Sequence, residues 1–251
     1  MKQKTIGEIK AELKAAEESM LPVFIENYKE DTRSGVQAAV AQAKKRIEKL
    51  EAERARIEAL KKYEYEYAEY TYICGIDEAG RGPLAGPVAA GAVILPKDCD
   101  ILYINDSKKL SAAKREALYD EIMEKAVAVG VGLVGPQRID EINILQATYE
   151  AMREAIRNLG VAPDILLNDA VTIPEVSIPQ VPIIKGDAKS ISIGAASIIA
   201  KVTRDRLMAE YDELMPEYGF ASNNGSAEHI AAIKKYGASP IHRMTFIKNF
   251  I

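Results

Sequence analysis

Cysteine is scarce in this 251-residue chain, and neither a long apolar run nor an internal repeat is present. Cys74 and Cys99 are too few for a disulfide framework, and neither belongs to a CxxC pair that would indicate zinc. Charges interrupt the first 14 residues, and no apolar run approaches membrane-spanning length, so we expect neither a secretory signal nor a transmembrane helix. These absences predict a protein of the reducing cytoplasm.

The composition that remains is typical of a soluble globular protein, with 48% hydrophobic and 28% charged residues. The net charge of -4 is unusual for a protein that binds nucleic acid. The first 70 residues balance 14 basic with 14 acidic residues, so the acidic excess lies after them. If four carboxylates there bind two divalent cations, this part is nearly neutral, so charge neither supports nor excludes a polyanionic substrate.

Residues 1–68 are predicted to form a helical N-terminal extension. Thr5 with Glu8 and Ser34 with Gln37 match capping boxes that precede runs of helix formers. The later apolar spacing of three and four indicates a helical hairpin or short coiled coil. We favour packing or a solvated surface over an arm that binds nucleic acid or another protein, and we expect a monomer. The recurring apolar residues are Val36, Val40, Ala43, Ile47, Leu50 and Ile57.

Residues 69–251 are predicted to form a second domain. Five tyrosines between Tyr63 and Tyr72 mark the boundary; their rings could stack on bases, but the neighbouring glutamates repel phosphate, so we favour packing. Strands and helices then alternate, which predicts an α/β fold with a mixed sheet flanked by helices. The predicted strands cover 73–76, 89–95, 129–134, 165–167 and 181–184, and the predicted helices cover 112–127, 144–159 and 190–215.

Acidic residues follow three of these strands. Asp77 and Glu78 follow the first strand, Asp169 follows the fourth, and Asp187 follows the fifth. Ligands collect at strand ends of open α/β sheets, so the four carboxylates can converge there. Mg²⁺ or Mn²⁺ would relieve their repulsion, and two such ions can hydrolyse a phosphodiester. The alternative is that each acid is an ordinary turn residue or helix N-cap.

The segment from Asp77 reads DEAGRGPLAGPV and is rich in glycine. Gly80 and Gly82 let backbone N–H groups approach a ligand closely, and Arg81 adds donors suited to phosphate. Arg81-Gly82 replaces the Lys-Ser/Thr of a P-loop, and the glycine spacing misses the dinucleotide-binding pattern by one residue. The segment is therefore neither of these two nucleotide-binding loops.

Four motifs in one order closely resemble bacterial ribonuclease HII over roughly residues 72–246. They are DEAGRGPLAGPV, DSKKL from Asp106, GDAKS from Gly186 and HRMTF from His242. The resemblance implies a ribonuclease-H-like fold. It also implies an endonuclease that cuts the RNA strand of RNA/DNA hybrids, and 5′ of ribonucleotides embedded in duplex DNA, leaving 3′-hydroxyl and 5′-phosphate ends.

The resemblance also implies roles for single residues. Its loop that senses the ribose 2′-hydroxyl, the group that separates RNA from DNA, matches Gly80, Arg81 and Gly82. Its four metal-binding acids, which would hold two Mg²⁺ or Mn²⁺ ions, match Asp77, Glu78, Asp169 and Asp187.

Four further residues fall within matching motifs or beside them. Ser107 and Lys108 resemble phosphate contacts, with a loop and helix cap as the alternative. His242 and Arg243 are expected to border the active site.

The helix expected at 190–215 carries two more candidates. Lys201 and Arg204 share one face and could contact phosphates, but Lys201 could instead pair with Asp205. The small residues 195–197 are interpreted as close packing of this helix against the sheet.

Two positions depart from the family pattern. Members carry Gly-Tyr-Gly-Thr before Glu-His, whereas this chain has a shorter stretch from Ser222 to His229, with Asn224 nearest to the tyrosine. That tyrosine packs on the sugar beside the scissile junction, so we expect a weakened preference for a single embedded ribonucleotide. Asn168 replaces a commonly apolar residue and is expected to adjust the orientation of Asp169.

Two other functions stay open. An enzyme like ribonuclease HIII prefers runs of ribonucleotides, but it carries a different N-terminal domain from the helical one expected here. A silent hybrid-binding module whose helical arm recruits a partner is disfavoured because all four acids are retained.

Overall fold

The computed structural model describes residues 4–222 and 225–251. The chain divides into two compact units, Met1–Ala59 and Leu60–Ile251. The predicted boundary near residue 68 stays a prediction. Within the described ranges, no helix has both the length and the apolar character needed to cross a membrane.

The first helix of the N-terminal unit begins as predicted. α1 (Ile6–Ala15) starts with a capping box, in which the N–H of Glu8 donates to the Thr5 hydroxyl and the N–H of Thr5 donates to the Glu8 carboxylate. The second predicted box is wrong. The N–H of Gln37 donates to the carbonyl of Arg33, so it needs no cap from a serine hydroxyl. The Gln37 side chain instead donates to the carbonyls of the preceding turn.

Three helices share the core of this unit. α2 (Leu21–Tyr28) and α3 (Ser34–Leu60) pack with α1, and the 3-10 turn η1 (Glu18–Met20) joins the first two. The predicted hairpin or coiled coil is therefore a three-helix unit, because α1 and α2 both cover the apolar side of α3. The buried residues are Ile9, Leu13, Leu21, Phe24, Val36, Ala39, Val40 and Ala43.

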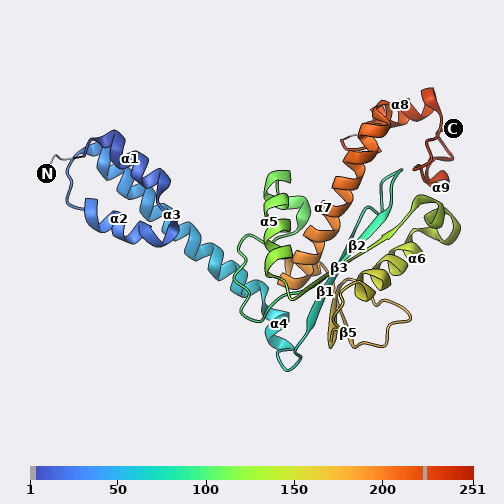
Figure 1. Cartoon of the computed structure of the whole chain (residues 1–251), viewed down its shortest axis with the longest axis horizontal. Coiled ribbons are helices and arrows are strands. Elements are labelled where there is room, and N and C mark those ends of the chain that lie inside the picture. The colour runs from blue at the N-terminus through green and yellow to red at the C-terminus, as the bar shows by residue number, and fades with distance from the viewer. Residues whose placement is uncertain (1–3, 223–224) are drawn as a thin grey trace. The chain divides into compact units, whose positions relative to one another are not determined.

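The second unit contains a five-stranded mixed sheet in the order β3-β2-β1-β4-β5 (Figure 1). The pairs β1–β2 and β2–β3 are antiparallel, whereas β4 runs parallel to both β1 and β5. Every predicted strand is present. The strands are β1 (Ile73–Ala79), β2 (Val88–Ile94), β3 (Ala128–Val134), β4 (Ile165–Asp169) and β5 (Gln180–Ile183).

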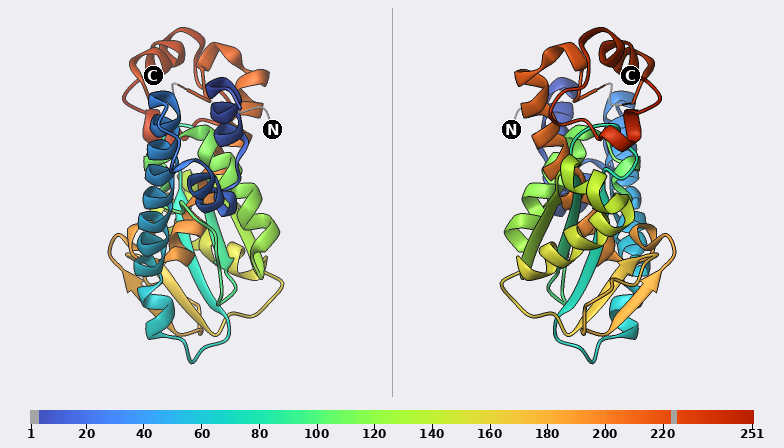
Figure 2. Two further views of the ribbon diagram at one scale, coloured as in Figure 1. Left: turned by 90° about the vertical axis from the view of Figure 1, so that its left-hand side faces the viewer. Right: turned by 90° about the vertical axis from the view of Figure 1, so that its right-hand side faces the viewer.

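Helices cover both faces of this sheet (Figures 1 and 2). α7 (Ile191–Leu214) packs on one face with α5 (Ala112–Lys125) beside it, and α6 (Pro136–Arg157) packs on the other. This arrangement confirms the predicted α/β fold. The shorter elements are α4 (Lys62–Glu66), η2 (Ser107–Lys109), η3 (Gly186–Ala188), η4 (Pro216–Tyr218), α8 (Ala227–Tyr236) and α9 (Met244–Ile247).

Close packing brings α7 against the strands that carry the acids. A Cβ on Gly91 of β2 would lie 2.5 Å from the carbonyl oxygen of Ala196, so no side chain fits there. This contact confirms the packing role predicted for residues 195–197. It also places the first turns of α7 over the end of β1.

The tyrosines before β1 pack on the protein. Tyr63, Tyr67 and Tyr70 lie against an apolar cluster of β1, β4, β5 and α7. Tyr72 packs on the cluster of the opposite face. These four rings therefore pack on the protein, as predicted.

Two histidines join the segments near the C-terminus. His229 and His242 are 0% and 2% exposed, and their Nε2 atoms lie 3.0 Å apart. The N–H of Gly225 donates to Nδ1 of His229, and Ser239 contacts Nδ1 of His242 at 2.8 Å. Burial, and then the neighbouring His229, lowers the pKa of His242 to about 4. The pair is therefore neutral at physiological pH and lies among the rings around Tyr218.

We predict that this pair makes the protein sensitive to acid. The folded protein binds the His242 proton more weakly than the unfolded chain does, so the free energy of unfolding should fall as pH drops from about 6.5 to about 4. The slope from one proton is at most about 1.4 kcal/mol per pH unit. Chemical denaturation across this range should show the fall, and His242→Asn should flatten it. An identical slope in the variant would contradict the assignment.

Candidate active site

The order of the strands brings the predicted acids to one end of the sheet. β1 and β4 pair in parallel up to the residues immediately before Asp77 and Asp169, so these two acids lie at the same level. Asp77 and Glu78 lie inside β1 rather than after it, because both still pair with β2 beyond the last contact with β4. Asp187 lies in η3, which follows β5.

One cavity of about 350 Å³ lies at this end. Its lining includes every predicted site residue except His242 and Arg243. Ala79, Pro83 and Ser197 also line it and were not predicted. The predicted residues that line it are Asp77, Glu78, Gly80, Arg81, Gly82, Ser107, Lys108, Asp169, Asp187, Lys201 and Arg204.

Asp77 is the most deeply placed of the acids, with 6% of its surface exposed. Its side chain faces α7, because the paired residue Gly91 packs on that helix. Oδ1 accepts a 2.7 Å hydrogen bond from the N–H of Glu78. Burial and then the charge of Glu78 raise the pKa of Asp77 well above its usual range, and hydrogen bonding to Ser197 opposes this shift.

The other acids are held by different donors. Asp169 Oδ1 accepts a 2.7 Å hydrogen bond from the N–H of Gly186, which ties the end of β4 to η3. Glu78 lies 3.4 Å from Arg81; burial raises the pKa of Glu78 and Arg81 lowers it. Burial raises the pKa of Asp187 as well as that of Glu78.

Charge repulsion also raises the pKa of Asp187. Asp106 and then Asp169 raise the pKa of Asp187 further, and Lys108 opposes them. Asp106 was not predicted as a site acid. Its signal in the sequence was its place at the start of DSKKL.

The donor set fits a hard divalent cation. Four carboxylates line one cavity, and three of them have raised pKa values. A positive ion would offset both the cost of burying these negative charges and their mutual repulsion. Over residues 4–222 and 225–251, no three His, Cys, Asp or Glu side chains are already grouped as ligands of one ion. Asp77 and Asp169 each accept a backbone N–H through Oδ1, and Glu78 lies beside Arg81.

Ser107 and Lys108 form one wall of the cavity. Ser107 is buried, and its hydroxyl lies 3.0 Å from that of Ser197. Asp106 caps η2 by accepting the N–H of Lys108. The helix cap is therefore Asp106 rather than Ser107, and the side chain of Lys108 is left to line the cavity.

Lys201 pairs with Asp205 on the same helix, as one of the two interpretations predicted. Arg115 also contacts Asp205, at 3.7 Å. Lys201 nevertheless lines the cavity, so the pair lies at its edge.

Arg204 and Arg243 differ in placement from the predicted contacts with substrate. Arg204 is 6% exposed and donates from Nε and Nη2 to the carbonyls of Pro87 and Ala85, so these two donors are taken up by the loop although the residue lines the cavity. Arg243 is fully buried behind the glycine-rich loop, and His242 lies in the histidine pair. Neither His242 nor Arg243 lines the cavity, although Arg243 donates to the carbonyls of Gly80 and Arg81, which do.

Asn168 does not orient Asp169. Consecutive strand residues point to opposite faces, so the Asn168 side chain points away from the Asp169 carboxylate. Its Nδ2 donates to the side chain of Gln180, which in turn bonds to the loop at Ile173. The expectation that concerns Asn224 lies outside the described residues.

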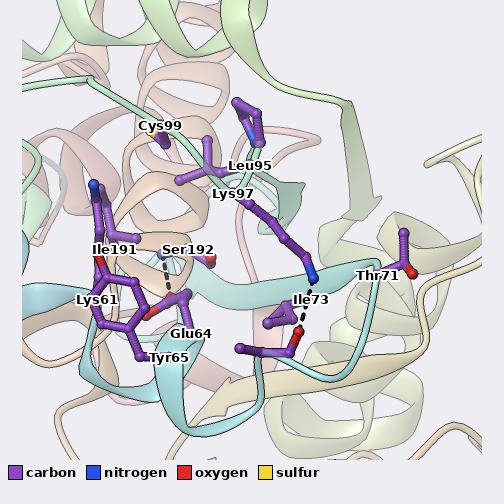
Figure 3. Close-up of a pocket in the computed structure, with 12 residues that line it drawn as sticks. Lys61, Glu64, Tyr65, Thr71, Ile73, Leu95, Lys97, Cys99, Ile191 and Ser192 are labelled. Carbon is purple, nitrogen blue, oxygen red and sulfur yellow. Dashed lines mark hydrogen bonds between the residues drawn. The ribbon is translucent and has the colours of Figure 1, made fainter.

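A second cavity, of about 180 Å³, lies near the start of β1 (Figure 3). Ile73, Leu95 and Ile191 give it apolar walls, and the Glu64 carboxylate accepts hydrogen bonds from Ser190 and from the N–H of Ser192. Glu64 thus caps the beginning of α7. This cavity lacks a cluster of acids and is distinct from the candidate active site.

Comparison with known proteins gives two family matches. A family model described as Ribonuclease HII matches residues 74–249, and a model described as Ribonuclease HII N-terminal domain matches residues 5–68. A Ribonuclease HII from Lachnoclostridium phytofermentans is 66% identical over 246 residues, which cover 97% of each chain. A Ribonuclease HII from Clostridioides difficile is 50% identical over 255 residues, covering all of both.

Solved structures agree with this assignment. The ribonuclease H2 of Pyrococcus horikoshii has a TM-score of 0.61 and 29% identity, covering 71% of this chain and 96% of its own. A manganese-bound Bst-RNase HIII, at 16% identity and a TM-score of 0.57, covers 70% of this chain and 67% of its own, and shows the shared fold only. The chain therefore belongs to the ribonuclease HII family and is a metal-dependent ribonuclease.

Proposed function

We propose that the protein hydrolyses the RNA strand of RNA/DNA hybrids and cuts 5′ of ribonucleotides embedded in duplex DNA, leaving 3′-hydroxyl and 5′-phosphate ends. The observation that carries the proposal is the cavity in which Asp77, Glu78, Asp169 and Asp187 lie beside the loop of Gly80 to Gly82. We place this activity in the cytoplasm, in a monomer.

The four acids would hold two Mg²⁺ or Mn²⁺ ions. When bound, such ions activate water and stabilise the leaving oxygen of a phosphodiester. The protein holds the side chains of the site in position. The N–H of Gly186 fixes the end of β4 through Asp169, and the capping of η2 by Asp106 directs Lys108 to the cavity. Lys108 then offers positive charge to a backbone phosphate.

The glycine-rich loop would select the sugar. Gly80, Arg81 and Gly82 line the cavity next to the acids, and the 2′-hydroxyl is the group that separates a ribonucleotide from a deoxyribonucleotide. Backbone N–H groups at this loop can approach a sugar closely, because two of its three residues lack side chains.

The two competing functions fit less well. The N-terminal match is to the ribonuclease HII domain, which argues against an enzyme like ribonuclease HIII. A silent binding module has no need of four carboxylates in one cavity, three of them with raised pKa values.

Asp77→Asn tests the catalytic role of the acids. Loss of one metal-binding oxygen should lower the single-turnover rate on an RNA/DNA hybrid by ~100-fold or more, because even groups that only support metal ligands contribute 10- to 100-fold. Affinity for the hybrid should change little. Asp98→Asn, at an exposed carboxylate outside the cavity, is the matched control. Full activity of Asp77→Asn would overturn the assignment.

The same substitution should stabilise the protein when metal is removed. The folded state raises the pKa of Asp77, so its charge opposes folding at neutral pH. In EDTA at pH 7, we expect Asp77→Asn to raise the free energy of unfolding by about 1 kcal/mol, or roughly 2–4 °C in Tm. The gain should shrink as pH falls and the native carboxylate takes up a proton. A loss of stability would show that the carboxylate supports the fold.

Substrate preference tests the proposed change in selectivity. Because the tyrosine that packs on the junction sugar in the family has no counterpart near Asn224, we expect a weakened preference for a single embedded ribonucleotide. Specificity constants for a one-ribonucleotide duplex and a full hybrid of the same sequence provide the measurement. A strong preference for the one-ribonucleotide duplex would refute this part of the proposal.

A further inference from the structure

Two buried arginines lie behind the glycine-rich loop. Arg204 and Arg243 come from α7 and from the segment before α9, far apart in the sequence. In the part of the chain that the structure describes, neither guanidinium forms an ion pair. Their hydrogen bonds go to backbone carbonyls of one loop, residues 80–87.

Arg243 binds three carbonyls of this loop. Its Nη2 donates to Gly80 at 2.6 Å, its Nη1 to Arg81 at 2.9 Å and its Nε to Gly86 at 2.9 Å. Its own N–H donates to the carbonyl of Leu84 at 2.9 Å. One side chain, 0% exposed, thus fixes both ends of the loop.

Arg204 supports the same loop from α7. Its Nε donates to Pro87 at 2.9 Å and its Nη2 to Ala85 at 3.0 Å. Gly80 has a φ of 89°, and a Cβ added there would lie 2.1 Å from Nε of Arg204. Loop and guanidinium are therefore in direct contact, and Gly80 cannot be replaced without moving one of them.

The geometry of the peptide group links these contacts to the cavity. In a trans peptide, the carbonyl of one residue and the N–H of the next point in opposite directions. Because Arg243 holds the carbonyls of Gly80 and Arg81, the N–H groups of Arg81 and Gly82 point away from it. Among the described residues, neither N–H has a protein acceptor. Both residues line the cavity, whereas Arg243 does not.

We propose that Arg243, supported by Arg204, is a positioning residue that aims the N–H groups of Arg81 and Gly82 at the ribose 2′-hydroxyl. The inference rests on the proposed function of the loop. It assigns part of the sugar selectivity to Arg243, a side chain that does not line the cavity. The pKa of Arg243 is lowered to about 9, by burial and by Arg204, so the guanidinium keeps its charge at neutral pH.

The test compares binding of two duplexes that differ by one 2′-hydroxyl. Dissociation constants in EDTA are measured for a DNA duplex with one ribonucleotide and for the same duplex without it. We expect Arg243→Met to reduce the ratio of the two constants about 10-fold, since one lost hydrogen bond of typical net strength corresponds to that factor. Because lysine cannot bridge three carbonyls, the ratio for Arg243→Lys should lie between the ratios for Arg243→Met and the wild type. Hydrogen exchange at the amides of Arg81 and Gly82 should change as well.

Arg206→Met is the matched control. Like Arg243→Met, it removes one positive charge, but from an exposed position on α7 that is paired with Glu116. The ratio of the two dissociation constants should therefore stay at the wild-type value. If Arg243→Met does not fold, Arg243→Lys and Arg204→Lys carry the test. A folded Arg243 variant with the wild-type ratio overturns the inference and leaves the proposed function intact. A wild type that neither distinguishes the duplexes nor cleaves a hybrid overturns the proposed function itself.

Discussion

The repulsion between carboxylates at one end of the sheet is the constraint on which the rest of this structure depends. Asp77 in β1 lies beside Asp169, which ends the parallel neighbour β4, and burial and then the charge of Glu78 disfavour the ionised form of Asp77. Such a site costs stability, and the surrounding fold holds Asp169 and Asp77 in place by hydrogen bonds from the N–H groups of Gly186 and Glu78. A hard divalent cation bound among these carboxylates neutralises their charges. The repulsion that destabilises the empty site then favours binding of the cation.

The fold was largely predictable from the sequence. Apolar periodicity located the five strands and the three long helices, because strands buried by helices on both faces read as short apolar runs. The N-terminal unit was harder: the pattern in α3 was clear, but the packing of α1 and α2 against it depends on a tertiary core that no local signal specifies. The Ser34 box failed because the carbonyl of Arg33 already accepts the N–H that a cap would satisfy.

The acids and the glycine-rich loop of the candidate site were predictable from the sequence. The residues that surround and support them were less predictable. Strand ends indicated where Asp77 and Asp169 would lie, and the topology brings them together. Arg204 was expected to face phosphate, because helical spacing gives a face but does not show whether that face is buried. Ser197 was missed for a related reason: a small residue in a packing run gives no sign that its hydroxyl reaches a cavity.

The central claim is that these acids bind divalent metal together, and calorimetric titration with Mn²⁺ tests it most directly. The wild type should bind the ion with release of protons, because carboxylates with raised pKa values give them up. Asp169→Asn should weaken binding by at least about 10-fold. Equal affinity in the two proteins, with no proton release, would contradict the account.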